Sequence, residues 1–205
     1  NLFVAFEVML IASYVLLTLG AGAQQIRSGM TYVVINVLAS TLLLSTVGLI
    51  YGATGTVNMA ELVTRYAELP STTQAALGIM LTAVFAIKAA LVPVFFWLPD
   101  SYPTAPVAVT AVFAGLLTKI GVYVMIRFHV LTGMDALGGL MLVLAGLTMI
   151  IGVAGALAQD DVKRILSFHI ISQIGYMLMG LGLFSVGGIA CAIFFLVHQI
   201  PVKTV

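Results

Sequence analysis

Long apolar runs separated by short polar stretches make up most of this chain. One helical crossing of a bilayer core needs about 20 apolar residues, and about seven runs approach that length. The alternation of polar and apolar positions that is typical of a transmembrane β-barrel is not found. We therefore predict an all-α, polytopic transmembrane helix bundle. The expected segments are 1–20, 30–53, 74–98, 105–128, 135–157, 161–184 and 186–205.

One shorter stretch, between the second and third segments, has a different pattern. Glu61 and Arg65 are spaced to pair on one face of a helix, which predicts an amphipathic helix lying at the membrane interface. Its apolar positions at helical spacing are Met59, Leu62, Val63 and Tyr66. Further along, Trp97 and Tyr102 flank the sequence LPDSYP, and we expect their rings to mark the headgroup level.

Basic residues in the connections give the orientation. Counting connections alternately, Arg27, Lys163 and Arg164 fall on one side, whereas Arg65 and Arg127 fall on the other. The small excess favours a cytoplasmic location for the first group.

Composition supports a membrane protein and excludes other classes. Of the 205 residues 62% are hydrophobic and 7% are charged, with a net charge of +1 and a mean hydropathy of +1.21. A soluble domain carries about a quarter charged residues, and a nucleic-acid-binding surface would need a basic excess. Cys191 is the single cysteine, so neither a disulfide framework nor a cysteine metal site is predicted.

The chain is expected to form one membrane domain over residues 1–205. It starts at Asn1 inside an apolar run without the basic region of a signal peptide, which indicates an internal part of a longer protein. Small residues in the fifth segment are expected to let neighbouring helices approach closely. They are Gly139, Gly146, Gly152 and Gly155.

Charged residues inside the apolar segments are the candidates for function. A charge at the bilayer centre costs about 2.5–3.5 kcal/mol on the mildest scale, so such a residue marks a functional site by default. Lys88 lies about ten residues, or roughly 15 Å of helix, from the Trp97 end of its segment, which is beyond the reach of a lysine stem. Lys119 is equally deep in the next segment, and Glu7 lies in the first.

A helix breaker follows the first of these lysines. Pro93 removes a backbone donor, and a freed backbone group at membrane depth must be satisfied by protein or water. A broken helix beside Lys88 therefore predicts a polar cavity, although a proline kink that only aids packing remains an alternative.

The histidines are weaker candidates. His129, beside Arg127 at a helix end, is expected in a solvated connection. For His169 a packing or hydrogen-bonded role is as well supported as a functional one. His198 is the better candidate because Lys203 follows it in an otherwise apolar helix. None has a partner at metal-ligand spacing, so no metal site is predicted.

Together these groups suggest a mechanism. A buried amine gives up its proton more readily, and a nearby carboxylate makes it hold that proton. A row of such groups along the membrane midplane is a proton relay, in which histidine changes charge near neutral pH.

Two blocks of sequence resemble a known family. These are KAALVPVFFWLPDSYPTAPVAVTAVFAGLLTKIGVYVMIRF (Lys88–Phe128) and QDDVKRILSFHIISQIGYMLMG (Gln159–Gly180). They are similar to the proton-translocating antiporter-like subunits of Mrp-type sodium/proton antiporters, respiratory complex I and membrane-bound hydrogenases. The stretch FAGLLTKIGVY is most similar to the Mrp D subunit. The resemblance implies the middle helices of a larger bundle that has inverted helical repeats and a broken helix.

The resemblance also assigns site residues. It implies an ion pair between Glu7 and Lys88 and places the helix break at Pro93. The relay that it implies consists of Glu7, Lys88, Lys119, His198 and Lys203. The pattern departs from the family at Gln199, where relatives often carry another histidine, and at Pro201.

The implied function is that of a subunit of a multisubunit cation/proton antiporter that exchanges sodium for protons. The alternatives are a proton-pumping antiporter-like subunit of complex I (NADH:quinone oxidoreductase) or of a hydrogenase, and a non-transporting membrane scaffold. No nucleotide, quinone or metal motif is present, so we expect no cofactor and no bond chemistry by this chain itself. Expected partners are other membrane subunits of a hetero-oligomeric assembly, protons, sodium and the lipid bilayer, but not nucleic acid. The expected location is the cell (inner) membrane.

Overall fold

All secondary structure in the described residues, 1–133 and 137–204 of this computed structural model, is helical. Six helices are long and apolar enough to cross a membrane, and α1 is a shorter apolar helix. The elements are α1 (Leu2–Thr18), α2 (Ala23–Thr54), α3 (Met59–Ala67), α4 (Ser71–Ala89), α5 (Trp97–Ser101), the 3-10 helix η1 (Tyr102–Thr104), α6 (Val107–Thr132), α7 (Gly138–Leu157), α8 (Val162–Gly182) and α9 (Val186–Thr204). The predicted all-α membrane bundle is confirmed. Residues 134–136, at the start of the predicted segment 135–157, and Val205 lie outside the described part.

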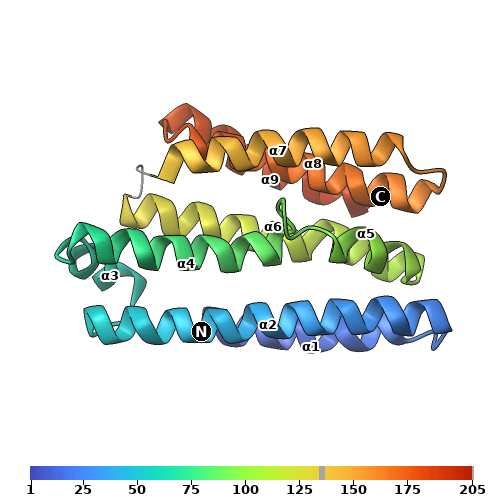
Figure 1. The fold of residues 1–205 in the computed structure, drawn as a ribbon, viewed down its shortest axis with the longest axis horizontal. Coiled ribbons are helices and arrows are strands. Elements are labelled where there is room, and N and C mark those ends of the chain that lie inside the picture. The colour runs from blue at the N-terminus through green and yellow to red at the C-terminus, as the bar shows by residue number, and fades with distance from the viewer. Residues whose placement is uncertain (134–136, 205) are drawn as a thin grey trace.

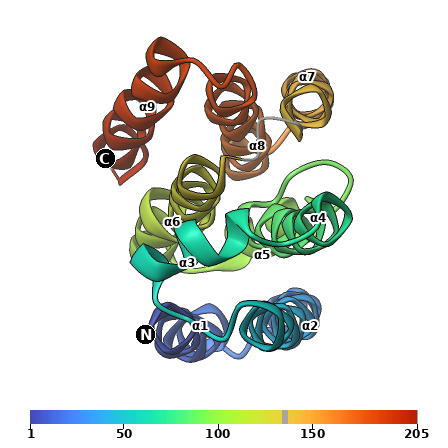
Figure 2. The same cartoon turned by 90° about the vertical axis from the view of Figure 1, so that its left-hand side faces the viewer.

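The helices are arranged in three layers that lie nearly parallel to one long axis. Figure 1 shows α1 and α2 below, α4 to α6 in the middle, and α7 to α9 above. The end-on view in Figure 2 shows the same three layers and places α3 across one end of the middle layer. The middle layer therefore contacts both others and contains the broken helix.

Close packing between α7 and α8 depends on glycine. A Cβ added at Gly152 would lie 2.5 Å from the Ser172 nitrogen, and one at Gly155 would meet the Phe168 ring. Gly139 and Gly146 have no atom of the described residues within 4 Å of such a Cβ, so the predicted packing role is confirmed within this chain for two of the four glycines. These two lie on the face of α7 that contacts α8.

Helix α3 has the predicted amphipathic form. Leu62 and Tyr66 are buried against the bundle, whereas Val63 remains 40% exposed. Asn58 caps the helix by accepting a hydrogen bond from the Ala60 nitrogen at 3.1 Å. The fixed start and the single buried face keep α3 flat against the end of the bundle.

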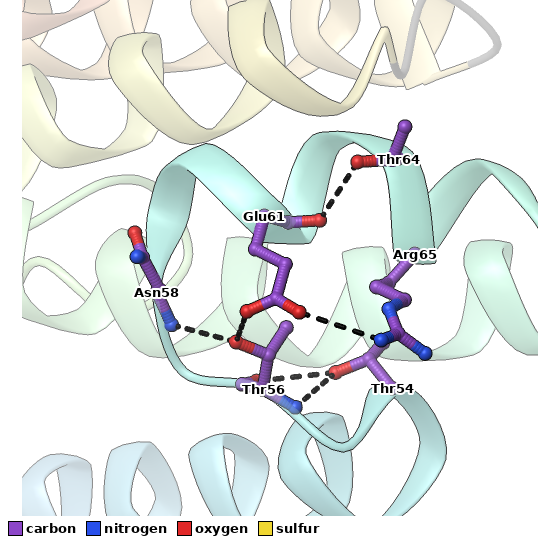
Figure 3. Close-up of polar contacts among 6 residues, drawn as sticks. All are labelled: Thr54, Thr56, Asn58, Glu61, Thr64 and Arg65. Atoms are coloured by element: carbon purple, nitrogen blue, oxygen red, sulfur yellow. Dashed lines mark hydrogen bonds and ion pairs between the residues drawn. The ribbon is translucent and has the colours of Figure 1, made fainter.

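A polar network fixes the turn between α2 and α3 (Figure 3). The Glu61 carboxylate accepts hydrogen bonds from Thr56 Oγ1 at 2.8 Å and from Arg65 at 3.4 Å. Thr56 Oγ1 also accepts from the Asn58 nitrogen at 3.2 Å, and Thr54 Oγ1 donates to the Thr56 carbonyl at 3.1 Å. The network is at the bundle end, where the Glu61 and Arg65 side chains remain about half exposed.

The opposite end of the bundle holds a second group of polar contacts. Arg164, at the start of α8, pairs with Asp100 of α5 at 3.3 Å. The Lys163 amine donates to the carbonyls of Pro103 and Ala105 at 3.4 Å. These contacts attach the α7–α8 turn to the second half of the broken helix. The α1–α2 and α7–α8 connections lie at this same end (Figure 1), as the sequence-based orientation requires.

Candidate functional site

The third spanning segment is broken in the middle of the bundle. Helix α4 ends at Ala89, residues 90–96 are non-helical, and α5 and η1 continue to the far end. Ala90 adopts a left-handed conformation with φ of 58° and stops the helix one residue after Ala89. The predicted break is confirmed, but the helix ends four residues before Pro93.

Trp97 holds the two halves of this broken helix together. Its indole Nε1 donates a hydrogen bond to the Ile87 carbonyl at 3.0 Å. Trp97 and Tyr102 are 1% and 0% exposed, so both rings are covered by the bundle, and their expected place at the headgroup level stays a prediction. The indole bonds to a carbonyl near the break that also accepts from the Ala90 nitrogen at 3.2 Å, so this carbonyl has two donors.

Lys88 lies in the last turn of α4, directly before the break. Its side chain is 4% exposed, and its amine donates to Ser40 Oγ of α2 at 3.1 Å. The same amine lies over the Phe6 ring of α1, 5.0 Å from the ring centroid. A neutral hydroxyl and an aromatic face are weaker partners for a buried ammonium than a carboxylate would be.

Glu7 follows Phe6 on the same helix as this ring. Its buried Oε1 has no hydrogen-bond partner among the described residues. The side-chain ion pairs of the described part are Arg65–Glu61 and Arg164–Asp100, both at the bundle ends. The expected Glu7–Lys88 ion pair is therefore not a direct contact in this structure.

Lys119 lies in the centre of α6 and is 2% exposed. Its amine donates to the Ala114 carbonyl of its own helix. Two glycines bring other helices close: a Cβ at Gly121 would lie 3.2 Å from the Ala89 nitrogen, and one at Gly115 would meet Thr204 of α9. Lys119 therefore lies between the end of α4 that carries Lys88 and the end of α9 that carries Lys203.

Between α8 and α9 is a polar cluster that the sequence did not identify. The Lys203 amine is 2.9 Å from His169 Nδ1, and Gln199 Nε2 donates to Gln173 Oε1 at 3.3 Å. Gln173 Nε2 is 3.5 Å from His169 Nε2, so all four side chains form one chain of contacts. Thr204, next to Lys203, faces Gly115 of α6, which lies one helical turn before Lys119. The cluster thus extends the line of charged groups across the third layer.

The two remaining histidines lie elsewhere. His198 is exposed, and its ring contacts in the described chain are with Phe194 and Phe195 of its own helix. His129 is 1% exposed, 3.2 Å from Thr82 Oγ1 and 2.8 Å from the Met125 carbonyl. Its expected place in a solvated connection is wrong, because Thr82 of α4 provides a partner inside the bundle.

Three buried side-chain atoms in the described residues have no hydrogen-bond partner. They are Glu7 Oε1, Thr118 Oγ1 and Gln199 Oε1. Thr118 precedes Lys119 in sequence, and Gln199 precedes Lys203 by one helical turn. An unsatisfied buried polar group costs about 1–3 kcal/mol, and natural proteins usually satisfy such groups with buried water. All three lie beside the charged groups of the site.

Comparisons with known proteins agree with this geometry. The chain is 51% identical over 207 residues to the D subunit of the Na(+)/H(+) antiporter of Alkalihalophilus pseudofirmus, covering 99% of this chain and 42% of that protein. A chain of the Mrp complex from Dietzia sp. DQ12-45-1b superimposes with a TM-score of 0.90 at 39% identity, covering 98% of this chain and 39% of that one. A chain of respiratory complex I from Thermus thermophilus, solved with bound aureothin, gives 0.83 at 27% identity over 98% and 44% of the two chains.

These matches and the family assignment cover nearly all of the chain. The chain spans about two-fifths of the length of the relatives that it matches. The transmembrane family described as NADH:quinone oxidoreductase/Mrp antiporter matches residues 1–203. Its apolar helices, its broken helix and this match identify the chain as a member of that family of multi-pass membrane proteins.

Proposed function

We propose that this chain is part of an Mrp-type antiporter subunit that exchanges sodium for protons in the cell membrane. The likeness to the antiporter D subunit supports the assembly type. In this proposal residues 1–205 act as one membrane domain whose partners are the other membrane subunits of a hetero-oligomeric complex. Lipid surrounds the domain, and protons and sodium are the transported ions.

Protons move in this proposal along a midplane relay across the three layers. The relay begins at Glu7 and Lys88, continues through Lys119, and reaches Lys203. His169 takes the role first expected of His198, because it contacts the Lys203 amine at 2.9 Å. The Pro93 segment leaves Lys88 at the end of a helix, where its amine is held by one hydroxyl.

The observation that carries the proposal is the position of the three unpartnered buried atoms. Each is next to, or part of, a proposed relay residue. Water bound at Glu7, Thr118 and Gln199 would provide donors and acceptors between amines that do not touch each other. If these side chains served only to pack the helices, there would be no reason for unsatisfied polar atoms to gather beside buried charges.

Replacement of Lys119 in the assembled complex tests the relay. Lys119→Met keeps most of the side-chain length without a titratable group, and Lys119→Ala removes the side chain. Both variants should assemble normally and lose sodium-dependent pH change in membrane vesicles. Lys119→Arg should not restore transport, because arginine holds its proton too tightly.

The same vesicles distinguish the other assemblies. A pH change that depends on quinone or ferredoxin instead of sodium would indicate a complex I or hydrogenase subunit; a complex I chain has a similar fold. Normal assembly with full exchange in both Lys119→Met and Lys119→Ala would overturn the relay and favour a scaffold.

A further inference from the structure

A single threonine connects the broken helix to the third layer. Thr148 is the only polar side chain in α7, whose other residues from Gly138 to Leu157 are all apolar. It is 0% exposed. Its hydroxyl donates to the Leu144 carbonyl at 2.6 Å and accepts a hydrogen bond from the Val92 nitrogen at 3.3 Å. One hydroxyl therefore bonds both to its own helix and to the non-helical segment between α4 and α5.

The Val92 bond is the one of the described backbone bonds at the break that reaches another layer. The nitrogens of Ala90 and Leu91 donate to the carbonyls of Ile87 and Ala86, so the helix end satisfies both of them. Pro93 has no N–H group, and the Val94 nitrogen donates to the Leu91 carbonyl at 2.7 Å.

The Val92 nitrogen thus depends on a group outside the break. Val92 is 7% exposed, and at membrane depth its N–H group needs a protein partner or water. Figure 1 shows the connection between α4 and α5 reaching toward the α7–α9 layer, and Figure 2 shows the same approach end-on.

This bond is well placed to affect Lys88. Val92 follows Lys88 by four residues, within the segment that ends α4 and fixes the direction of its last turn. Ser40 holds the Lys88 amine from the side of the first layer, whereas Thr148 holds the backbone from the side of the third. Helix α7 packs closely on α8 at Gly152, and α8 carries His169.

We propose that Thr148 is a positioning residue for Lys88, resting on the proposed proton relay. Its hydroxyl fixes the broken segment against α7, so the Lys88 amine keeps a set place relative to the α7–α8 pair. In this role the Thr148 side chain acts through the backbone of Val92.

Thr148→Val tests this because valine keeps the shape of threonine and removes the hydroxyl. The matched control is Thr46→Val in α2. Thr46 is also 0% exposed, and its hydroxyl makes the same bond within its own helix, to the Leu42 carbonyl at 2.7 Å, with no bond to another helix among the described residues. Thr148→Ser, which keeps the hydroxyl, should restore the wild-type behaviour.

The first readout is amide hydrogen exchange of the 90–96 segment in the intact complex. Thr148→Val should speed exchange at Val92 by about three- to tenfold, the loss expected for one net hydrogen bond, and Thr46→Val should not. Equal exchange in the two variants would overturn the proposal. This readout does not depend on transport, so it stands even if the relay is disproved by the Lys119 variants.

The second readout is the pH profile of sodium-dependent exchange. Thr148→Val should lower the maximal rate severalfold and shift the profile, with the sodium KM unchanged, because the moved group is Lys88. Faster amide exchange with an unchanged rate and pH profile would show that the hydrogen bond exists but positions nothing. That result would also reject the proposal.

Discussion

Replacing Gly152 by alanine should separate α7 from α8. The added Cβ would lie 2.5 Å from the Ser172 nitrogen, 2.8 Å from its Cα and 2.9 Å from its Cβ. The shortest of these contacts is about 1 Å closer than ordinary van der Waals contact. The neighbouring atoms are mostly backbone of a regular helix, which cannot rotate away as a flexible side chain could. The two helices must therefore move apart along much of their length.

The size of the effect follows from a comparison within one helix. Gly146→Ala makes the same change in α7 where nothing lies within 4 Å of the new Cβ. Both variants gain the helix propensity of alanine over glycine, about 1 kcal/mol, so this gain cancels in the difference between them. The remaining difference is the cost of overpacking, about 1–3 kcal/mol in favour of Gly146→Ala.

Thermal unfolding of the purified assembly, followed by circular dichroism, measures this difference. The Gly146→Ala variant should unfold at or above the wild-type temperature, and Gly152→Ala clearly below it. Transport should also fall in Gly152→Ala, because Gln173 and His169 lie on the displaced helix. Equal unfolding temperatures for the two alanine variants would show that the close approach at Ser172 is not essential to the packing.

Three further changes have distinct expected outcomes. His169→Phe should reduce sodium-dependent exchange in vesicles at least tenfold while His198→Phe has a small effect, and the reverse order would return the relay role to His198. Ala90→Val places a β-branched residue at φ 58° in a fully buried site, so the free energy of unfolding should fall by about 1–3 kcal/mol in a denaturation assay. Burial raises the pKa of Tyr66 to about 12, so its contribution to stability is complete below pH 10 and is lost as the pH rises toward 12. Tyr66→Phe, which also removes the hydrogen bond to the Gln74 carbonyl, should abolish that part of the pH dependence of unfolding; an unchanged pH dependence would contradict it.

The number and place of the helices could be predicted because membranes impose them. A bilayer fixes the length of an apolar segment, and helices are the form in which such a segment satisfies its own backbone. The end of α4 was harder to place. Pro93 indicated a break, yet the helix stops at Ala90, which takes a left-handed conformation that alanine does not favour. Packing of the buried Ala90 against the bundle sets where the helix ends, and no local sequence pattern indicates that position.

Side-chain partners across helices were the least predictable part of the site. Trp97 resembled an interfacial anchor and His129 a loop residue, but each bonds to a group far away in sequence. The sequence does contain a pattern from which the α8–α9 cluster could have been predicted. His169 and Gln173 are four residues apart on one apolar helix, as are Gln199 and Lys203 on the next, and this spacing puts each pair on one face.

Replacing a buried lysine should affect the stability of the protein and its transport function in different ways. Replacing a buried charge by an apolar residue of similar volume is often neutral or stabilising, and a charge at membrane depth costs a few kcal/mol. Within the described part of the chain, the Lys119 amine bonds to a carbonyl of its own helix, so packing between helices gives no reason to keep it. Lys119→Met should therefore raise the unfolding temperature of the assembly or leave it unchanged while transport is lost. A variant that loses both would show that Lys119 holds the bundle together, and the case for a relay through α6 would then fail.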